Sequence, residues 1–74
     1  MSERVLVTTG MKCPKPLFEV HKYMKGLAGG DVVRVLADDP AFRLDIQAWC
    51  RRSGNRLVDL REENSAYVAL IQKA

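Results

Sequence analysis

The residues of this chain with the clearest chemical potential lie in the segment 10–16, whose sequence is GMKCPKP. The segment places Cys13 between two lysines and two prolines, where an expected strand ends and an expected helix begins. A helix N-terminus presents unpaired N–H groups and the positive end of the helix dipole, and Lys12 and Lys15 add positive charge. All of these are expected to lower the pKa of the Cys13 thiol. Because the thiolate is the nucleophilic form of cysteine, the segment predicts sulfur chemistry at Cys13.

The two prolines favour a rigid and exposed cysteine. If Cys13 is the N-cap, Pro14 takes the first helical position, where proline is favoured, and Pro16 stays within the first turn. The backbone N–H groups of Lys15 and Leu17 are then the first donors able to reach the sulfur. In the alternative interpretation, Cys13 is a small apolar residue beside a helix start that happens to contain prolines. The complete pattern, between a strand and an amphipathic helix, favours the reactive site.

Composition indicates a small folded protein. The chain has 74 residues, 47% of them hydrophobic and 28% charged, which predicts one domain over residues 1–74 with a single core. It contains no apolar run long enough for a membrane span, and its first residues lack the apolar core of a signal peptide. We therefore expect a cytoplasmic protein with two reduced cysteines and no membrane partner. The net charge of +3 is only a mild bias toward acidic partners or RNA.

The hydrophobic pattern predicts the element order βαβαββ. Strands are expected over residues 4–8, 31–37, 55–61 and 66–73, and the last two flank a turn at 62–65. One helix follows Pro14, with an apolar stripe at Leu17, Val20, Met24 and Leu27. The other has Asp39 as its N-cap, a stripe at Phe42, Ile46, Trp49 and Cys50, and Gly54 at its end. The fold class predicted is a two-layer α/β (α+β) sandwich, a four-stranded mixed sheet with two helices on one face.

Several of these features together resemble the TusA/SirA-like sulfur carriers. They are Gly-x-x-Cys-Pro-x-Pro at a helix start, Lys22, the run Ala37-Asp38-Asp39-Pro40 after a strand, and Asp45-Ile46 with Cys50 in the next helix. The similarity covers essentially the whole chain. It implies a cytoplasmic sulfurtransferase that accepts sulfane sulfur as a persulfide on the cysteine matched by Cys13 and passes it to a partner protein.

The resemblance also implies the partners and the chemistry around the sulfur. A cysteine desulfurase or rhodanese-like enzyme would donate the sulfur, and a second protein would accept it, in tRNA thiolation or in sulfur oxidation. No cofactor beyond the covalent persulfide, no direct nucleic-acid binding and a monomeric state are expected. Lys12, Pro14, Lys15 and Pro16 are expected to stabilise the persulfide or to dock a partner. Val7 stands where many relatives carry an aspartate, which weakens assignment to the tRNA-thiolation branch.

Two further residues are candidates for a chemical role together with Cys13, one as a second thiol and the other as a base. Cys50 matches a second cysteine of some relatives and is a possible secondary thiol, although its place in an apolar stripe favours the core. His21 lies about 12 Å of helical rise from Cys13, far beyond hydrogen-bond reach, which argues against a hydrolytic dyad. The site therefore predicts a carrier that uses a stabilised thiolate rather than a general base. Neither cysteine forms a recognised zinc spacing with His21, and no metal is expected.

For the acidic and basic residues in and around the second expected helix, a structural role explains the pattern at least as well as a functional role. Asp38 and Asp39 resemble a catalytic carboxylate pair, but helix capping accounts for Asp39. Arg43 and Asp45 are expected on the exposed side of the helix, where they either dock a partner or are simply solvated. The densest basic cluster is interpreted as a surface feature, and it comprises Arg51, Arg52 and Arg56.

Two other function classes remain open from the sequence. A βαβαββ sandwich with a basic surface is compatible with an RNA- or protein-binding regulatory module that does no chemistry. RNA platforms stack bases on exposed aromatic side chains of the sheet, whereas most aromatic residues here fall on the expected helices. A thiol-redox protein is a weaker alternative, because the two cysteines lie on separate helices rather than in a Cys-x-x-Cys pair.

Overall fold

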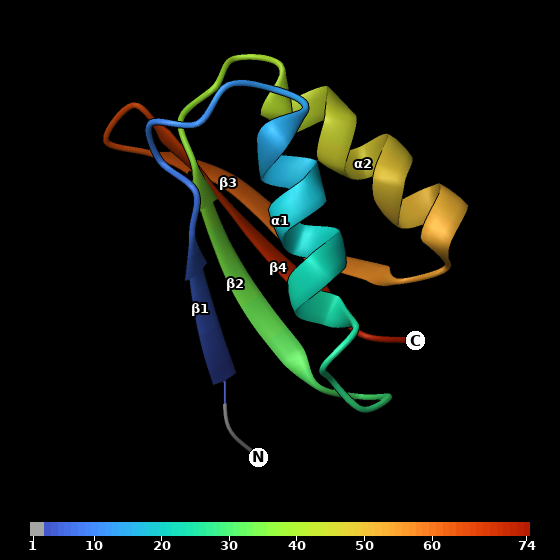
Figure 1. Ribbon diagram of the computed structural model, residues 1–74. Helices are drawn as coiled ribbons and strands as arrows, with labels where there is room; N and C mark the ends of the chain where they lie inside the picture. The colour runs from blue at the N-terminus through green and yellow to red at the C-terminus, as the bar shows by residue number, and fades with distance from the viewer. Residues whose placement is uncertain (1–2) are drawn as a thin grey trace.

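The computed structural model describes residues 3–74 as a four-stranded sheet and two helices (Figure 1). The elements are β1 (Glu3–Val7), α1 (Lys15–Met24), β2 (Val32–Ala37), α2 (Phe42–Ser53), β3 (Arg56–Glu63) and β4 (Ala66–Gln72). The strand order is β1-β2-β4-β3, with β1 parallel to β2 and the other neighbours antiparallel. The predicted mixed sheet and element order are confirmed. Residues 1–2, which entered the expectation about a signal peptide, lie outside the described residues.

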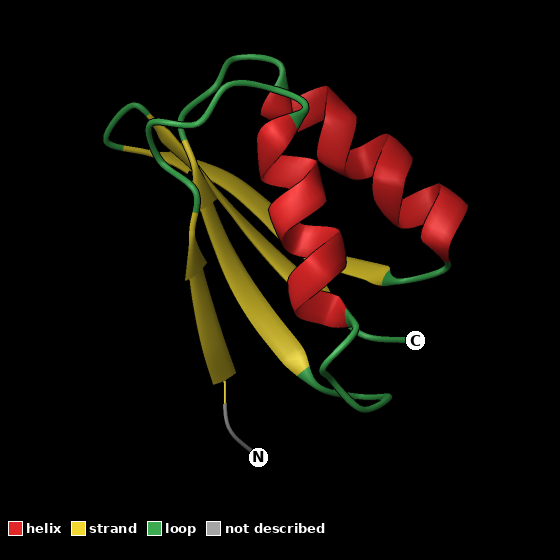
Figure 2. Cartoon of the chain, in the orientation of Figure 1, coloured by secondary structure: helices red, strands yellow, loops and turns green. Residues whose placement is uncertain are grey.

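Both helices cover the same face of the sheet (Figure 2). The core lies between these two layers, because its buried residues come from α1, α2 and the central strands β2 and β4. Burial alternates along β2, so that Val33, Val35 and Ala37 face the helices. The helical stripes predicted from the sequence meet them from the other side. The fully buried side chains of these stripes include Val20 on α1 and Ile46 on α2. Within residues 3–74, no helix is long and apolar enough to cross a membrane.

The parallel pairing of β1 and β2 brings the two helix starts together. Each strand leads into a helix, and both helices begin at the same end of the sheet (Figure 1). The Gly10 N–H donates to Asp38 Oδ1 at 3.0 Å, which joins the loop after β1 to the loop after β2. Thr8, fully buried at the end of β1, donates its hydroxyl to the Leu36 carbonyl at 2.7 Å. We refer to this end of the molecule as the helix-start end.

Both helices begin later than the sequence predicts. The N-cap of α1 is Pro14, without a side-chain capping bond, so the expectation that Cys13 caps this helix is wrong. The N-cap of α2 is Ala41 rather than Asp39. Asp39 instead forms the preceding turn, because its carbonyl accepts the Phe42 N–H at 3.0 Å and its carboxylate accepts the Ala41 N–H at 3.3 Å. The predicted end of α2 at Gly54 is confirmed, with the glycine in the left-handed region at a φ of 79°.

The β3–β4 hairpin closes more tightly than expected. β3 continues to Glu63, and only Asn64 and Ser65 form the turn, instead of residues 62–65. Both turn residues have positive φ, 51° and 65°, which a two-residue hairpin turn requires and which asparagine tolerates well. The longer pairing places Ser65 near the helix-start end.

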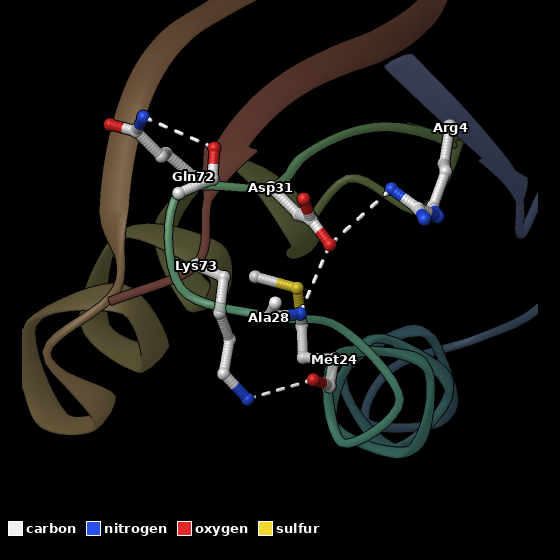
Figure 3. Close-up of polar contacts among 7 residues, drawn as sticks. Arg4, Met24, Ala28, Asp31, Gln72 and Lys73 are labelled. Atoms are coloured by element: carbon white, nitrogen blue, oxygen red, sulfur yellow. Dashed lines mark hydrogen bonds and ion pairs between the residues drawn. The ribbon is translucent and has the colours of Figure 1, made fainter. Parts of the chain in front are cut away.

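At the opposite end of the sheet, Asp31 fixes the connection from α1 to β2 (Figure 3). Its carboxylate accepts the Ala28 N–H at 3.0 Å and forms an ion pair with Arg4 at 3.5 Å. Lys73 Nζ donates to the Met24 carbonyl at 2.8 Å and so caps the last turn of α1. We refer to these contacts as the Asp31 cluster. They hold the far end of the layers together, away from the helix starts.

Candidate functional site

The predicted reactive residue, Cys13, lies at the helix-start end in the loop that enters α1. Its side chain is partly buried, and its Sγ donates a hydrogen bond to Asp45 Oδ2 at a distance of 2.6 Å. Asp45 belongs to the first turn of α2. The shared end of the two helices therefore brings together two residues that are far apart in the sequence.

The environment of Cys13 disfavours the thiolate. Burial, the hydrogen bond to Asp45 and the negative charge of that carboxylate raise the thiol pKa from 9.0 to about 12, and the charge of Asp39 acts in the same direction. The expectation of a lowered Cys13 pKa is therefore wrong. Burial is the largest cause of the raised pKa, and the two carboxylates, which the local sequence does not reveal, add to it.

The backbone of α1 does not supply the expected donors to the sulfur. The Lys15 N–H donates to the Lys12 carbonyl at 2.9 Å, and the Leu17 N–H donates to the Pro14 carbonyl at 3.1 Å. These turn contacts use the two N–H groups that the sequence assigned to the sulfur. The error follows from the later start of α1, since a shift in the helix start changes which N–H groups are left unpaired.

The residues around Cys13 divide into an exposed and a buried set. Lys12, Pro14 and Lys15, which flank Cys13 in the sequence, are exposed. Pro16 is fully buried, so a role for it in docking a partner is wrong. Its position in the first turn of α1 gives it a packing role instead.

Asp45 is the site residue that the sequence analysis misplaced. The pattern put it with Arg43 on the exposed side of α2, but its side chain is partly buried and holds the Cys13 thiol. Arg43 is exposed, as expected. A signal was present: Asp45 lies in the first turn of a helix that must start at the same end of the sheet as Cys13. Position along the helix axis identifies the residue, whereas the hydrophobic stripe alone does not.

The loops at the helix-start end form an open hollow beside Lys12. Its volume is about 390 Å³. It is lined by the loop after β1, the loop after β2 and the β3–β4 turn, at Gly10, Met11, Lys12, Asp38, Asp39, Pro40 and Ser65. Asp38 and Asp39, considered above as a carboxylate pair, both border this hollow. Each accepts a backbone N–H, from Gly10 and Ala41 respectively, so both carboxylates also have structural roles.

Two large apolar side chains stand exposed near the starts of the helices. Phe18 on α1 is 65% exposed and Leu44 on α2 is 70% exposed. A single exposed apolar side chain is ordinary, but here Leu44 lies beside Asp45 in the first turn of α2, and Phe18 lies in the first turn of α1, just after the loop that holds Cys13. Apolar surface next to a reactive group suits transient contact with another protein.

The other candidate residues lie away from Cys13 or inside the core. Cys50 is only 4% exposed, packs in the core cluster and has its thiol pKa raised to about 11 by burial, which supports its interpretation as a core residue. His21 borders a separate hollow of about 230 Å³ with Trp49 and Lys73. Arg51, Arg52 and Arg56 are exposed around the end of α2 and the start of β3. Within residues 3–74, no three His, Cys, Asp or Glu side chains gather as metal ligands.

These features define a small two-layer thiol protein in which one partly exposed cysteine donates a hydrogen bond to a carboxylate and the other cysteine is buried in the core. The profile of the family described as Sulfurtransferase TusA matches residues 4–73. The chain therefore belongs to the TusA family of sulfur carriers.

Individual relatives agree with this assignment. Proteins described as "Sulfur carrier protein TusA" from Pseudomonas putida (strain W619) and Pseudomonas entomophila (strain L48) are 35% and 38% identical to the chain over 71 residues. These matches cover 96% of this chain and 89% of each relative. A "Putative sulfur carrier protein" from Aquifex aeolicus is 35% identical over 97% of this chain, but the match covers 36% of that longer protein. The crystal structure of a SirA-like protein from Desulfitobacterium hafniense superimposes with a TM-score of 0.83 at 25% identity, over 96% of both chains.

Proposed function

We propose that this protein is a sulfur-relay sulfurtransferase that carries sulfane sulfur as a persulfide on Cys13. The observation that supports the proposal most directly is the contrast between the two cysteines. Both are free thiols, but Cys13 is accessible at the helix-start end, whereas Cys50 is buried in the core. Membership of the sulfur carrier family supports sulfur transfer as the chemistry of this thiol.

The relay requires two transfers, each following the logic of thiol–disulfide exchange. In loading, Cys13 Sγ attacks the terminal sulfur of a persulfide on the donor, and the donor S–S bond breaks. The products are the Cys13 persulfide and the donor thiol. In unloading, an acceptor cysteine attacks the terminal sulfur of the Cys13 persulfide and regenerates the Cys13 thiol. Neither transfer needs an oxidant, a metal or a bound cofactor.

The donor, a cysteine desulfurase or a rhodanese-like enzyme, and the acceptor would use the same docking surface in turn. We define this surface by Phe18 and Leu44, which are apolar, and by Lys12, Lys15 and Arg43, which are cationic; all five are exposed. The apolar side chains provide burial, and the cations attract an acidic partner surface. The salt dependence of loading tests the cationic part, since the rate should fall as ionic strength rises.

The test of the proposal is intact mass under non-reducing conditions. The protein is incubated with a cysteine desulfurase and cysteine, or with polysulfide, and compared with Cys13→Ser and with the matched control Cys50→Ala. We expect the wild type and Cys50→Ala to gain sulfur that reductant removes, and Cys13→Ser to gain none. Sulfane sulfur on Cys13→Ser, or none on the wild type with any donor, would overturn the proposal.

The pathway is a second part of the proposal. We place the protein in the cytoplasm, delivering sulfur either to tRNA thiolation or to sulfur oxidation; the two free thiols fit a reducing compartment. Loaded protein can be offered to acceptor proteins of each pathway, and loss of its sulfur to one set but not to the other assigns the route.

The alternative of an RNA-binding module has little support from the aromatic residues. Four of the five lie on α1 or α2, and Tyr67 on β4 packs against Phe42 of α2 at a centroid distance of 6.4 Å. Within residues 3–74, the sheet face away from the helices therefore presents no aromatic side chain for base stacking.

A further inference from the structure

We propose that Asp45 is a catalytic residue of sulfur loading. Its carboxylate takes the proton of the Cys13 thiol as Sγ attacks the donor persulfide, and returns that proton to the departing donor sulfur. This inference deepens the proposed function and rests on it. It also replaces the expectation, drawn from the sequence, that the site works without a general base.

The geometry already matches that of a base and its proton. Asp45 Oδ2 lies 2.6 Å from Cys13 Sγ and accepts the hydrogen bond of the thiol. Direct hydrogen-bond contact is the first requirement for a general base. The backbone of Asp45 is fixed as well, because its N–H donates to the Ala41 carbonyl at 3.0 Å in the first turn of α2. The carboxylate therefore reaches the sulfur from a rigid element.

The free protein holds Cys13 as a neutral thiol, so the proton must be removed during the reaction. With a pKa of about 12, well under one thiol in a thousand is ionised near pH 7.5. A pre-formed thiolate is therefore a poor route to the persulfide. A base in contact with the thiol can remove the proton during the attack itself, so the free protein does not need a larger fraction of thiolate.

The proposed step balances in atoms and electrons. A bond forms between Cys13 Sγ and the terminal donor sulfur while the donor S–S bond breaks, and the electron pair of that bond stays on the donor cysteine. The Cys13 proton moves to Asp45 and then to the donor cysteine, which leaves as a thiol. The net reaction converts one thiol and one persulfide into one persulfide and one thiol.

Asp39 is the other carboxylate that acts on Cys13, but it is less suited to the role. Its Oδ2 accepts the Ala41 N–H at 3.3 Å, and its charge influences Cys13 less than that of Asp45 does. Lys12 and Lys15 bring opposite charge to the same end of the molecule. We assign the proton transfer to Asp45 because it contacts the reacting sulfur directly.

The test distinguishes two roles for Asp45: a general base in sulfur loading, or a residue that only sets the fraction of Cys13 present as thiolate. Two rates are measured at pH 7.5 on the full chain: alkylation of Cys13 by iodoacetamide, read peptide by peptide so that Cys50 is separate, and sulfur loading from a cysteine desulfurase. The variants are Asp45→Asn and the matched control Asp59→Asn, which removes an exposed carboxylate of β3 that pairs with Arg61 at 3.0 Å.

We expect Asp45→Asn to speed alkylation about tenfold or more, because the thiol pKa falls, and to slow loading about tenfold or more, because the base is lost. The ratio of loading to alkylation then falls about a hundredfold. Asp59→Asn should leave both rates unchanged.

A ratio that stays constant in Asp45→Asn would overturn the inference, since both rates would then follow the thiolate population alone. Alkylation that does not accelerate would also overturn it, because the hydrogen bond would not exist in solution. If the wild type takes up no sulfur, the proposed function fails and the inference fails with it. If the wild type loads and Asp45→Asn loads equally well, only the inference fails.

Discussion

Asp31 and Asp45 lie at opposite ends of the same sandwich and have opposite kinds of partner. Asp31 accepts a backbone N–H and pairs with the cation of Arg4, which stabilises a carboxylate. Asp45 instead accepts the hydrogen bond of the Cys13 thiol, with the charge of Asp39 close enough to act on the same sulfur. The far end has compensated charges, whereas the helix-start end has concentrated negative charge around a group that must become negative to react.

The difference shows how this small fold separates stability from reactivity. At the Asp31 cluster, hydrogen bonds and an ion pair hold α1 against the sheet. The helix-start end can therefore keep Asp45 beside Cys13, although this contact disfavours the thiolate. Groups whose pKa is shifted by uncompensated neighbouring charges are typical of functional sites. The cationic side chains at this end, Lys12 and Lys15, are exposed.

The largest expected effect comes from reversing the charge at the site. Asp45→Lys replaces the carboxylate beside Cys13 with an ammonium group, so the thiol pKa should fall from about 12 toward or below 9.0. Alkylation of Cys13 by iodoacetamide at pH 7.5 should rise about a hundredfold or more over the wild type.

The matched variant Asp31→Lys breaks an ion pair at the other end and should leave the Cys13 alkylation rate unchanged. Circular dichroism of both variants establishes that they fold. Equal alkylation rates in folded Asp45→Lys and wild type would show that Asp45 does not control the sulfur, and the contrast between the two ends would be lost.

The comparison also separates what the sequence predicts from what it misses. The fold, and the position of Cys13 between a strand and a helix, follow from local patterns: β-branched strands, amphipathic stripes and a cysteine followed by two prolines. The Cys13–Asp45 contact spans 32 positions and depends on the relative placement of two helix starts. A small change in where α1 begins redirects the N–H groups of Lys15 and Leu17 from the sulfur to carbonyl oxygens. Local periodicity locates elements, but their exact ends, which decide the electrostatics of the site, depend on tertiary contacts.

A second prediction concerns stability at high pH. Folding raises the thiol pKa of Cys13 to about 12 and that of Cys50 to about 11, from 9.0. The native state therefore keeps these protons when the unfolded chain has lost them. The resulting stabilisation is complete below pH 9 and is lost as the pH rises through 11 and 12.

Chemical denaturation at a series of pH values above 9 measures this loss of stability. The free energy of unfolding should fall less steeply in Cys13→Ser than in the wild type, because one of the two thiols is absent. In Asp45→Asn the contribution of Cys13 should move to lower pH. If Cys13→Ser and the wild type lose stability with identical slopes, Cys13 retains an ordinary pKa and its burial beside Asp45 has no effect on folding.

The smallest effect is expected at the Asp31 cluster. Asp31→Asn removes the ion pair with Arg4 and weakens the acceptor of the Ala28 N–H, in a side chain that is about one-third exposed. Partly exposed contacts of this kind contribute about 0.5–1.5 kcal/mol, so the free energy of unfolding should fall by that amount in urea denaturation. Cys13 alkylation and sulfur loading should keep their wild-type rates, because Asp31 contacts Ala28 and Arg4, whereas Cys13 contacts Asp45. A change in the Cys13 rates of a folded Asp31→Asn variant would mean that the ends are coupled through α1, and that the Asp31 cluster takes part in setting the geometry of the site.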